Sequence, residues 1–164
     1  MKYYNNQNIR RQDRLLEESR AEELLKSGEY GILSMVTPEG EGYGIPLNYV
    51  WDEDLNSIYI HCAPEGKKLK CIAQNPNVSF TVVGRTKVVP DKFTTNYESV
   101  VLACTARTHL PEDERMAALG LILDKYAPED KTIGLKYAQK SFHRTEILRL
   151  DIVSASGKCK RVHA

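Results

Sequence analysis

A strand, a loop and a helix start follow one another in the run Ile58-Tyr59-Ile60-His61-Cys62-Ala63-Pro64-Glu65-Gly66-Lys67-Lys68-Leu69. The apolar residues before His61 predict a strand, and Pro64 and Gly66 predict a turn. A helix that begins at Lys67 would direct its first backbone N–H groups and the positive end of its dipole at the loop before it. With the ammonium groups of Lys67 and Lys68 beside them, these donors predict a binding site for an anion such as a cofactor phosphate.

Lys67 and Lys68 have a second interpretation, as two solvated side chains. The helix dipole opposes a cation at this end by about 0.3–1 kcal/mol at low salt. A bound anion would offset that cost, which favours the binding role.

The composition is typical of a single globular domain. The chain has 164 residues, of which 41% are hydrophobic and 27% are charged, enough for one domain with a buried core. A formal net charge of +1 provides no basic field of the kind that nucleic-acid-binding proteins carry. No apolar run approaches the length of a membrane span, and the first eight residues lack the apolar core of a signal peptide. We therefore expect a cytoplasmic protein without a nucleic-acid or membrane partner.

The four cysteines, Cys62, Cys71, Cys104 and Cys159, are widely scattered. They form no CxxC pair, and none stands near a histidine at the spacing of zinc ligands. Reduced, partly buried thiols are the simplest interpretation, and we expect no metal site.

The first part of the chain predicts an arm followed by a helix. Residues 1–12 are polar and would be disordered unless something docks them. Ser19 and Glu22 stand at the spacing of a capping box, which places a helix start at Ser19 and its end near Ser27–Gly28.

The remaining pattern predicts six strands, over residues 30–37, 43–51, 57–62, 78–89, 97–108 and 145–153. Pro46 inside the second run indicates a sheet edge, a bulge or a ligand contact. Helices are expected over residues 67–74, from Pro111 to Tyr126 and over 135–142, and a basic tail over 157–164. Strands in hairpin order with helices inserted between them predict one α+β domain over residues 1–164, mainly β, with a six-stranded antiparallel barrel flanked by helices.

Further motifs accompany the opening run in a fixed order. They are Arg10-Arg11-Gln12-Asp13-Arg14, Gly31-Ile32-Leu33-Ser34-Met35-Val36, Gly44-Ile45-Pro46-Leu47-Asn48-Tyr49, Asn75-Pro76-Asn77-Val78-Ser79-Phe80, Tyr97-Glu98-Ser99-Val100 and Gly157-Lys158. Over nearly the whole chain this set resembles the pyridoxamine 5′-phosphate oxidase-like FMN-binding split barrels. Within them it looks closest to the 5-nitroimidazole-resistance, or nitroimidazole reductase, group.

The resemblance implies a homodimer that binds two FMN molecules in clefts between the subunits. It places a set of residues near the cofactor: Pro46, Leu47, Asn48 and Tyr49 along the isoalloxazine edge, His61 beside the flavin, Lys67 on the phosphate, and Glu98 and Ser99 reaching the flavin from the other subunit. Gly66 stands where the oxidases carry an arginine, and Lys68 is the candidate to replace that charge.

Each of these residues also has an interpretation without a ligand. His61 would be a core histidine bonded to a carbonyl group, or else a group that orients the substrate or delivers a proton. Pro46 and Asn48 would be edge-strand and turn residues, and Tyr49 would be a core aromatic. Glu98 and Ser99 would be ordinary polar residues of a strand.

The resemblance implies an FMN-dependent oxidoreductase that reduces nitroimidazole-like or other small electron acceptors, with His61 as the candidate catalytic residue. No GxGxxG follows a strand, so NAD(P)H would have to bind shallowly over the flavin. The alternative is a non-catalytic flavin or haem carrier or sensor on the same barrel. The substrate-phosphate arginine and histidine of the oxidases have no counterpart in residues 145–164, so pyridoxamine-phosphate oxidation is not expected.

Overall fold

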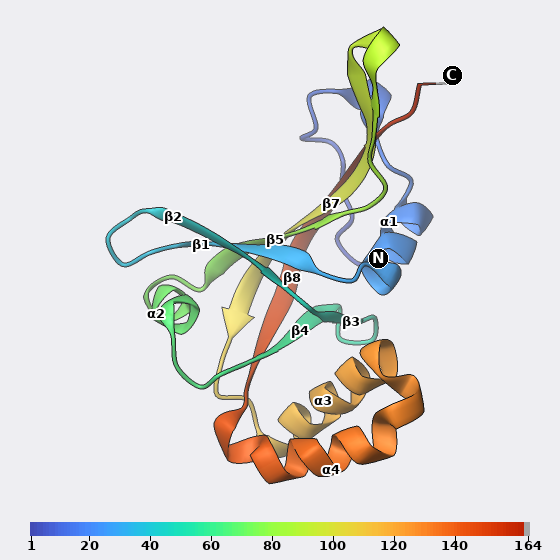
Figure 1. Ribbon diagram of the computed structural model, residues 1–164. Helices are drawn as coiled ribbons and strands as arrows, with labels where there is room; N and C mark the ends of the chain where they lie inside the picture. The colour runs from blue at the N-terminus through green and yellow to red at the C-terminus, as the bar shows by residue number, and fades with distance from the viewer. Residues whose placement is uncertain (163–164) are drawn as a thin grey trace.

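The computed structural model describes residues 1–162 and is shown as a ribbon in Figure 1. Within these residues the chain forms eight strands: β1 (Gly31–Val36), β2 (Gly42–Leu47), β3 (Val50–Asp52), β4 (Ser57–Cys62), β5 (Asn77–Val83), β6 (Lys87–Val89), β7 (Thr94–Arg107) and β8 (Glu146–Lys160). The same residues form four α-helices: α1 (Glu18–Ser27), α2 (Lys67–Gln74), α3 (Glu112–Tyr126) and α4 (Lys131–Ser141).

The strands form an antiparallel sheet with the order β2-β1-β5-β7-β8-β4-β3, and β6 pairs with β7. β2 and β3 stand at the two ends of this order, yet only Asn48 and Tyr49 separate them in the chain. The sheet therefore has to curl until its two edges meet (Figure 1). This curled sheet, flanked by helices, confirms the predicted split barrel.

The predicted number of strands was too small because two of the expected runs are interrupted. Residues 43–51 divide into β2 and β3 at Asn48 and Tyr49, where the backbone N–H of Tyr49 donates to the Tyr126 hydroxyl (2.9 Å) instead of continuing the ladder. Residues 78–89 divide into β5 and β6. Val83 pairs with Ser99, and Lys87 pairs with Asn96. Residues 84–86 therefore lie opposite only residues 97–98 of β7, and this mismatch interrupts the hydrogen-bond ladder.

The main core fills the inside of the barrel. β1 shows the alternation that places it there: Leu33 and Met35 are buried, whereas Ser34 and Val36 are exposed on the other face. α1 and α2 cover the barrel interior with buried side chains that join the same core, namely Ala21, Leu24, Leu25, Cys71 and Ile72. The period-two pattern of the sequence therefore sets which face of each strand is inside.

A second, smaller core lies between α3 and the outside of β3, β4 and β8. Its buried residues are Val50, Tyr59, Ala118, Leu119, Ile122 and Ile147. α3 and α4 lie side by side beneath the sheet (Figure 1). α3 begins one residue after Pro111, which is its N-cap rather than its first residue, and α4 begins earlier than predicted.

The N-terminal arm is docked on β8. The N–H of Asn5 donates to the Ala155 carbonyl (2.8 Å), and the N–H of Ala155 donates to the Tyr3 carbonyl (3.1 Å). The hydroxyl of Tyr4 donates to the Leu16 carbonyl (2.6 Å). These bonds supply the docking without which residues 1–12 were expected to be disordered.

Two predictions at the ends of elements were wrong. α1 begins at Glu18, its N-cap is Glu17, and no side chain caps it, so the capping box of Ser19 does not form. The basic tail is not a separate segment, because β8 continues to Lys160 and pairs with the start of β7. The last two residues of that predicted tail lie outside the described residues.

Candidate functional site

The loop before α2 ends in an open helix N-terminus. Gly66 is the N-cap, with φ of 134°, a backbone conformation that favours glycine, and no side chain caps the helix. The first turn holds no acidic residue, and it begins with Lys67 and Lys68. The helix predicted to start at Lys67 is therefore confirmed, and its first N–H groups have no side-chain acceptor.

A cavity of about 620 Å³ adjoins this helix start, between it and the β1–β2 turn. It is lined by Pro38, Glu39, Glu65, Gly66, Lys67 and Lys70. The ammonium of Lys67 lies over the ring of Tyr43, 4.5 Å from its centroid, which orients the charge by a cation–π contact. The arrangement can hold an anion between helix N–H groups and lysine ammonium groups.

His61 is the second-to-last residue of β4 and pairs with Ile147 of β8. Its side chain is exposed rather than satisfied in the core. Desolvation by neighbouring atoms and the positive charge of Lys68 lower the pKa of His61 below its ordinary 6.5. The imidazole is therefore neutral at pH 7 and offers one hydrogen-bond donor and one acceptor.

A smaller cavity of about 300 Å³ lies on the other side of the same loop and was not foreseen from the sequence. It is lined by Pro64, Glu65, Gly66, Leu69, Lys70, Ala73, Thr108, His109 and Glu146. His109 Nδ1 is 3.6 Å from Oε2 of the buried Glu146. The two residues are 37 positions apart in the chain, so no local motif connects them.

The residues predicted along the flavin edge divide between two faces. Pro46 is exposed on the outside of the barrel, opposite Ile32, whereas Leu47 packs against the main core. Asn48 is exposed, and its Nδ2 donates to the Glu29 carbonyl (2.8 Å). The side chain of Tyr49 is fully buried, and its hydroxyl donates to the Leu25 carbonyl (2.8 Å). Burial argues against a flavin contact through Tyr49, because this side chain has no surface to offer.

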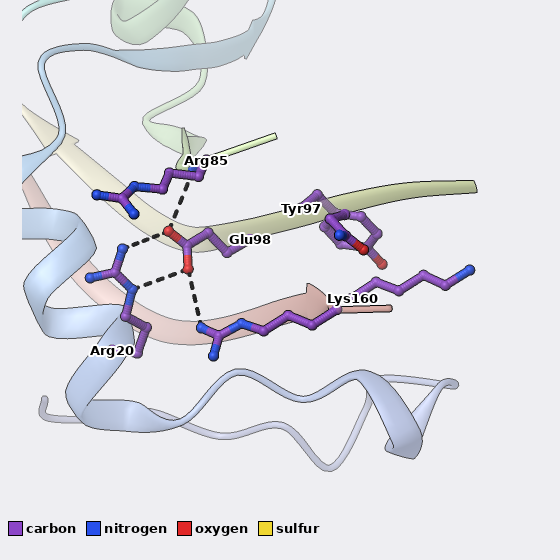
Figure 2. Close-up of a pocket in the computed structure, with 7 residues that line it drawn as sticks. Arg20, Arg85, Tyr97, Glu98 and Lys160 are labelled. Carbon is purple, nitrogen blue, oxygen red and sulfur yellow. Dashed lines mark hydrogen bonds and ion pairs between the residues drawn. The ribbon is translucent and has the colours of Figure 1, made fainter. Parts of the chain in front are cut away.

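Glu98 and Ser99 also point to opposite faces of β7, as neighbours on a strand do. Glu98 is buried, and its carboxylate accepts two hydrogen bonds from Arg20, of 2.6 and 3.1 Å (Figure 2). Ser99 is half-buried on the outer face, between Val83 and Lys158. The two residues cannot both line one flavin surface, and Glu98 belongs to an ion pair with α1.

Sequence reasoning missed the arginines around Glu98. Arg20 and Glu98 are separated by 78 positions, and Arg85 follows β5 without any motif around it. Only Arg161 stood in a recognised basic segment. No periodic pattern could have brought these residues together, since the pairing of β7 with β8 and the position of α1 do so.

Residues 17–159 match the family model described as pyridoxamine 5′-phosphate oxidase. The chain belongs to this family. No curated protein matches the chain.

Solved structures share the fold at low identity. A candidate 5-nitroimidazole antibiotic resistance protein from Bacteroides thetaiotaomicron is 20% identical, with a TM-score of 0.73 over 89% of this chain and 86% of that one. An FAD-binding protein from Mesorhizobium loti is 21% identical, with a TM-score of 0.65 over 90% and 98%. An FAD and haem binding protein from Mycobacterium smegmatis is 19% identical, with a TM-score of 0.68 over 91% and 74%. At these identities the likeness supports the fold.

Among residues 1–162, no helix combines the length and the apolar character needed to cross a membrane. Within the same residues, no group of three or more His, Cys, Asp and Glu side chains is arranged to hold a metal ion.

Proposed function

We propose that the protein binds FMN and acts as an oxidoreductase that reduces a small electron acceptor, of which nitroimidazoles are the first class to test. The observation that carries the proposal is the open N-terminus of α2, where Lys67, Lys68 and uncapped N–H groups lie together. The exposed His61 precedes Lys67 by six positions in the chain. Family membership and the FAD named in two structural relatives support a flavin as the ligand.

The residues at the α2 start fit a phosphate group chemically. A phosphate offers only acceptor oxygens at pH 7, and the first turn of this helix offers only donors: backbone N–H groups and two ammonium groups. Glu39 and Glu65 also line the adjoining cavity, so the phosphate would have to contact the helix start and not these carboxylates. Gly66 has no atom within 4 Å of the position that a Cβ would take, so its side is open to a ligand. We assign the FMN phosphate to Lys67 and Lys68.

Bound FMN would supply the hydride and electron chemistry, and this chain's residues would supply binding and orientation. Lys67 and Lys68 hold the phosphate, and the exposed Pro46 and Asn48 border the ring. The neutral imidazole of His61 hydrogen-bonds the acceptor or the ring and orients it. NADPH or NADH is the proposed electron donor, and four free thiols suit the reducing cytoplasm in which we place the protein.

We propose further that the flavin lies at the interface of a homodimer. The outer face of β1, β5 and β7 presents small and branched side chains in paired rows: Ile32, Thr81 and Val101, then Ser34, Ser79 and Ala103. A depression of about 410 Å³ lies on this face. Pro46 extends the first row through its pairing with Ile32, so a second copy on this face would border the proposed ring site.

Sedimentation velocity tests this interface. The wild-type protein should sediment as a dimer, and Val101→Arg, on the proposed interface, should sediment as a monomer because it buries a charge there. Val88→Arg, an exposed valine of β6 away from that face, should stay dimeric. A monomeric wild-type protein would contradict the proposal.

Anaerobic absorbance spectroscopy tests the activity. Purified protein incubated with FMN should carry a flavin spectrum, NADPH or NADH should bleach it, and a nitroimidazole should restore it. A protein that stays colourless after FMN and gel filtration would contradict the flavin proposal. Bleaching without recovery on addition of acceptors would instead favour the alternative of a flavin carrier or sensor. A Soret band after incubation with haemin would favour the haem alternative, for which a relative that binds both groups is the supporting observation.

A further inference from the structure

A second cationic pocket lies at the other end of the sheet from α2. It has a volume of about 370 Å³ and is lined by Arg20, Arg85, Asn96, Tyr97, Glu98, Lys160 and Arg161. Four cations and one carboxylate therefore line the pocket, and in Figure 2 the side chain of Lys160 extends away from Glu98. The cations come from α1, the β5–β6 connection and the end of β8.

The charge of Glu98 is already offset by Arg20. The guanidinium of Arg20 donates to both carboxylate oxygens, Nη2 to Oε1 (2.6 Å) and Nε to Oε2 (3.1 Å), and the backbone N–H of Arg85 adds a longer bond to Oε1 (3.4 Å). The pKa of Glu98 is lowered by this pair, so the carboxylate is ionised at pH 7. Arg20 also pairs with Glu23 (2.7 Å).

The other three cations have no carboxylate of their own among the residues that the structure describes. Arg161 Nη2 is 3.6 Å from Glu98 Oε2, beyond hydrogen-bond distance, on a side chain that is 67% exposed. The ammonium of Lys160 donates to the Thr94 hydroxyl. The guanidinium of Arg85 forms no ion pair within residues 1–162. An excess of positive charge therefore surrounds the pocket.

Hydrogen bonds hold the backbone segments that carry Arg85 and Arg161. Gly84 N–H donates to the Glu98 carbonyl (2.9 Å), and a Cβ on Gly84 would lie 2.6 Å from Glu98 Oε1. Only a glycine brings the chain before Arg85 this close. On the other side, Val162 N–H donates to Asn96 Oδ1 (2.8 Å) and Asn96 Nδ2 donates to the Val162 carbonyl (3.4 Å), which fixes the segment that carries Arg161.

We propose that this pocket binds the diphosphate of a nucleotide, with phosphate oxygens on Arg85 and Arg161 and the half-buried ring of Tyr97 beside the nucleoside. Arginine guanidinium groups match phosphate oxygens in a planar, two-bonded geometry. A groove of about 820 Å³ shares Arg20, Lys160 and Arg161 with the pocket and continues along residues 11–19. That groove gives the nucleoside room outside the pocket.

Within one chain this site is distinct from the proposed FMN phosphate site. At one end of β8, Glu146 pairs with Cys62, which precedes the loop before α2. At the other end, Lys160 pairs with Tyr97, which lines the pocket. These two pairs are 14 positions apart on β8, which is roughly 45 Å along the strand. Within one subunit, the inference therefore rests on residues that the proposed function does not use.

Isothermal titration calorimetry of the full chain at low ionic strength tests the site, with inorganic pyrophosphate, ADP and NADPH as probes. Wild type should bind ADP saturably, one per chain and more tightly than pyrophosphate, because Tyr97 adds a contact with the nucleoside. The double variant Arg85→Ala, Arg161→Ala should weaken ADP binding roughly tenfold or more through the loss of charge-assisted hydrogen bonds. Both side chains are exposed, and an unchanged thermal midpoint would verify the fold.

Two matched variants make the result decisive. Lys136→Ala, Lys140→Ala on α4 removes the same charge far from the pocket and should leave ADP affinity unchanged; an equal loss would overturn the proposal as a general charge effect. Lys67→Ala, Lys68→Ala should also bind ADP normally. If that variant alone loses ADP, the nucleotide binds at α2, which overturns this inference while leaving the proposed function intact. Absence of saturable binding to wild type, or pyrophosphate bound as tightly as ADP, would also overturn it.

The order of the nucleotide affinities identifies the source of the diphosphate. Tighter binding of NADPH than of ADP would support a dinucleotide, and the reverse order would support a free nucleotide.

Discussion

The start of α2 and the pocket around Glu98 both gather cations, but they do so in different ways. At α2 the charges are consecutive in the chain, Lys67 and Lys68, and the helix backbone supplies the other donors. At Glu98 the charges come from elements up to 141 positions apart, and a buried carboxylate holds one of them. The first site needs only a local conformation, whereas the second exists only in the folded protein.

The difference predicts different consequences when each site is altered. The α2 site has no internal counter-charge in its first turn, so its lysines contribute to ligand binding more than to stability. The Glu98 pocket contains its own ion pair, so loss of the carboxylate should affect folding. Three experiments compare the two regions on this basis.

The largest expected effect is on FMN affinity. Lys67→Ala, Lys68→Ala should weaken FMN binding by about 2–4 kcal/mol, because charge-assisted hydrogen bonds to the phosphate are lost. Fluorescence titration with FMN measures it. Arg85→Ala, Arg161→Ala is the control and should bind FMN like wild type; if the lysine variant does so too, the phosphate does not bind at α2.

A smaller effect is expected on stability from Glu98→Gln. This change should lower the free energy of unfolding by about 1–3 kcal/mol at pH 7, because the buried side chain loses charged hydrogen bonds from Arg20. The folded-state pKa of Glu98 lies below its ordinary 4.5, so its stabilisation is complete above pH 4.5 and is lost as the pH falls.

Urea denaturation at several pH values measures this difference. The gap between wild type and Glu98→Gln should narrow below pH 4.5, and Glu129→Gln, at an exposed position, should match wild type throughout. A gap that stays constant with pH would show that the carboxylate charge does not stabilise the fold.

The smallest expected effect is on the titration of His61. Lys68 lowers the pKa of this imidazole, so Lys68→Ala should raise it, and phosphate bound beside Lys68 should raise it as well. Proton NMR of the His61 ring resonances across the pH range measures both shifts. Lys136→Ala should leave the pKa of His61 unchanged. An unchanged pKa in Lys68→Ala would show that the charge of Lys68 does not act on His61.

Much of the fold followed from local pattern. The alternation in β1 and the turn chemistry before α2 placed those elements correctly, because side-chain burial on a strand has a period of two and Gly66 permits the backbone that the loop needs. The divisions of β2 from β3 and of β5 from β6 did not follow. They depend on the Tyr126 hydroxyl and on a register shift opposite β7, and neither leaves a local signal.

The candidate site was predictable to the same extent. Lys67, Lys68 and His61 are near one another because they are near in sequence, so the prediction located them together. The sequence left two roles open for Tyr49, a core aromatic or a contact with the flavin. The structure decides for the core, where Tyr49 packs next to Phe80 at 5.0 Å between ring centroids. Glu98 and Ser99 were grouped as neighbours, although a strand sends them to opposite faces.

The sequence by itself determined the strand–loop–helix unit at residues 58–69 and the face of each strand that is buried. Both depend on residues that are close together in the sequence. Tertiary structure decided which distant charges meet. Arg20, Arg85 and Arg161 reach Glu98 only because α1, the β5–β6 connection and the end of β8 converge there. Burial then makes that carboxylate dependent on its partner, because an ion withdrawn from water needs a counter-charge and hydrogen bonds to remain ionised.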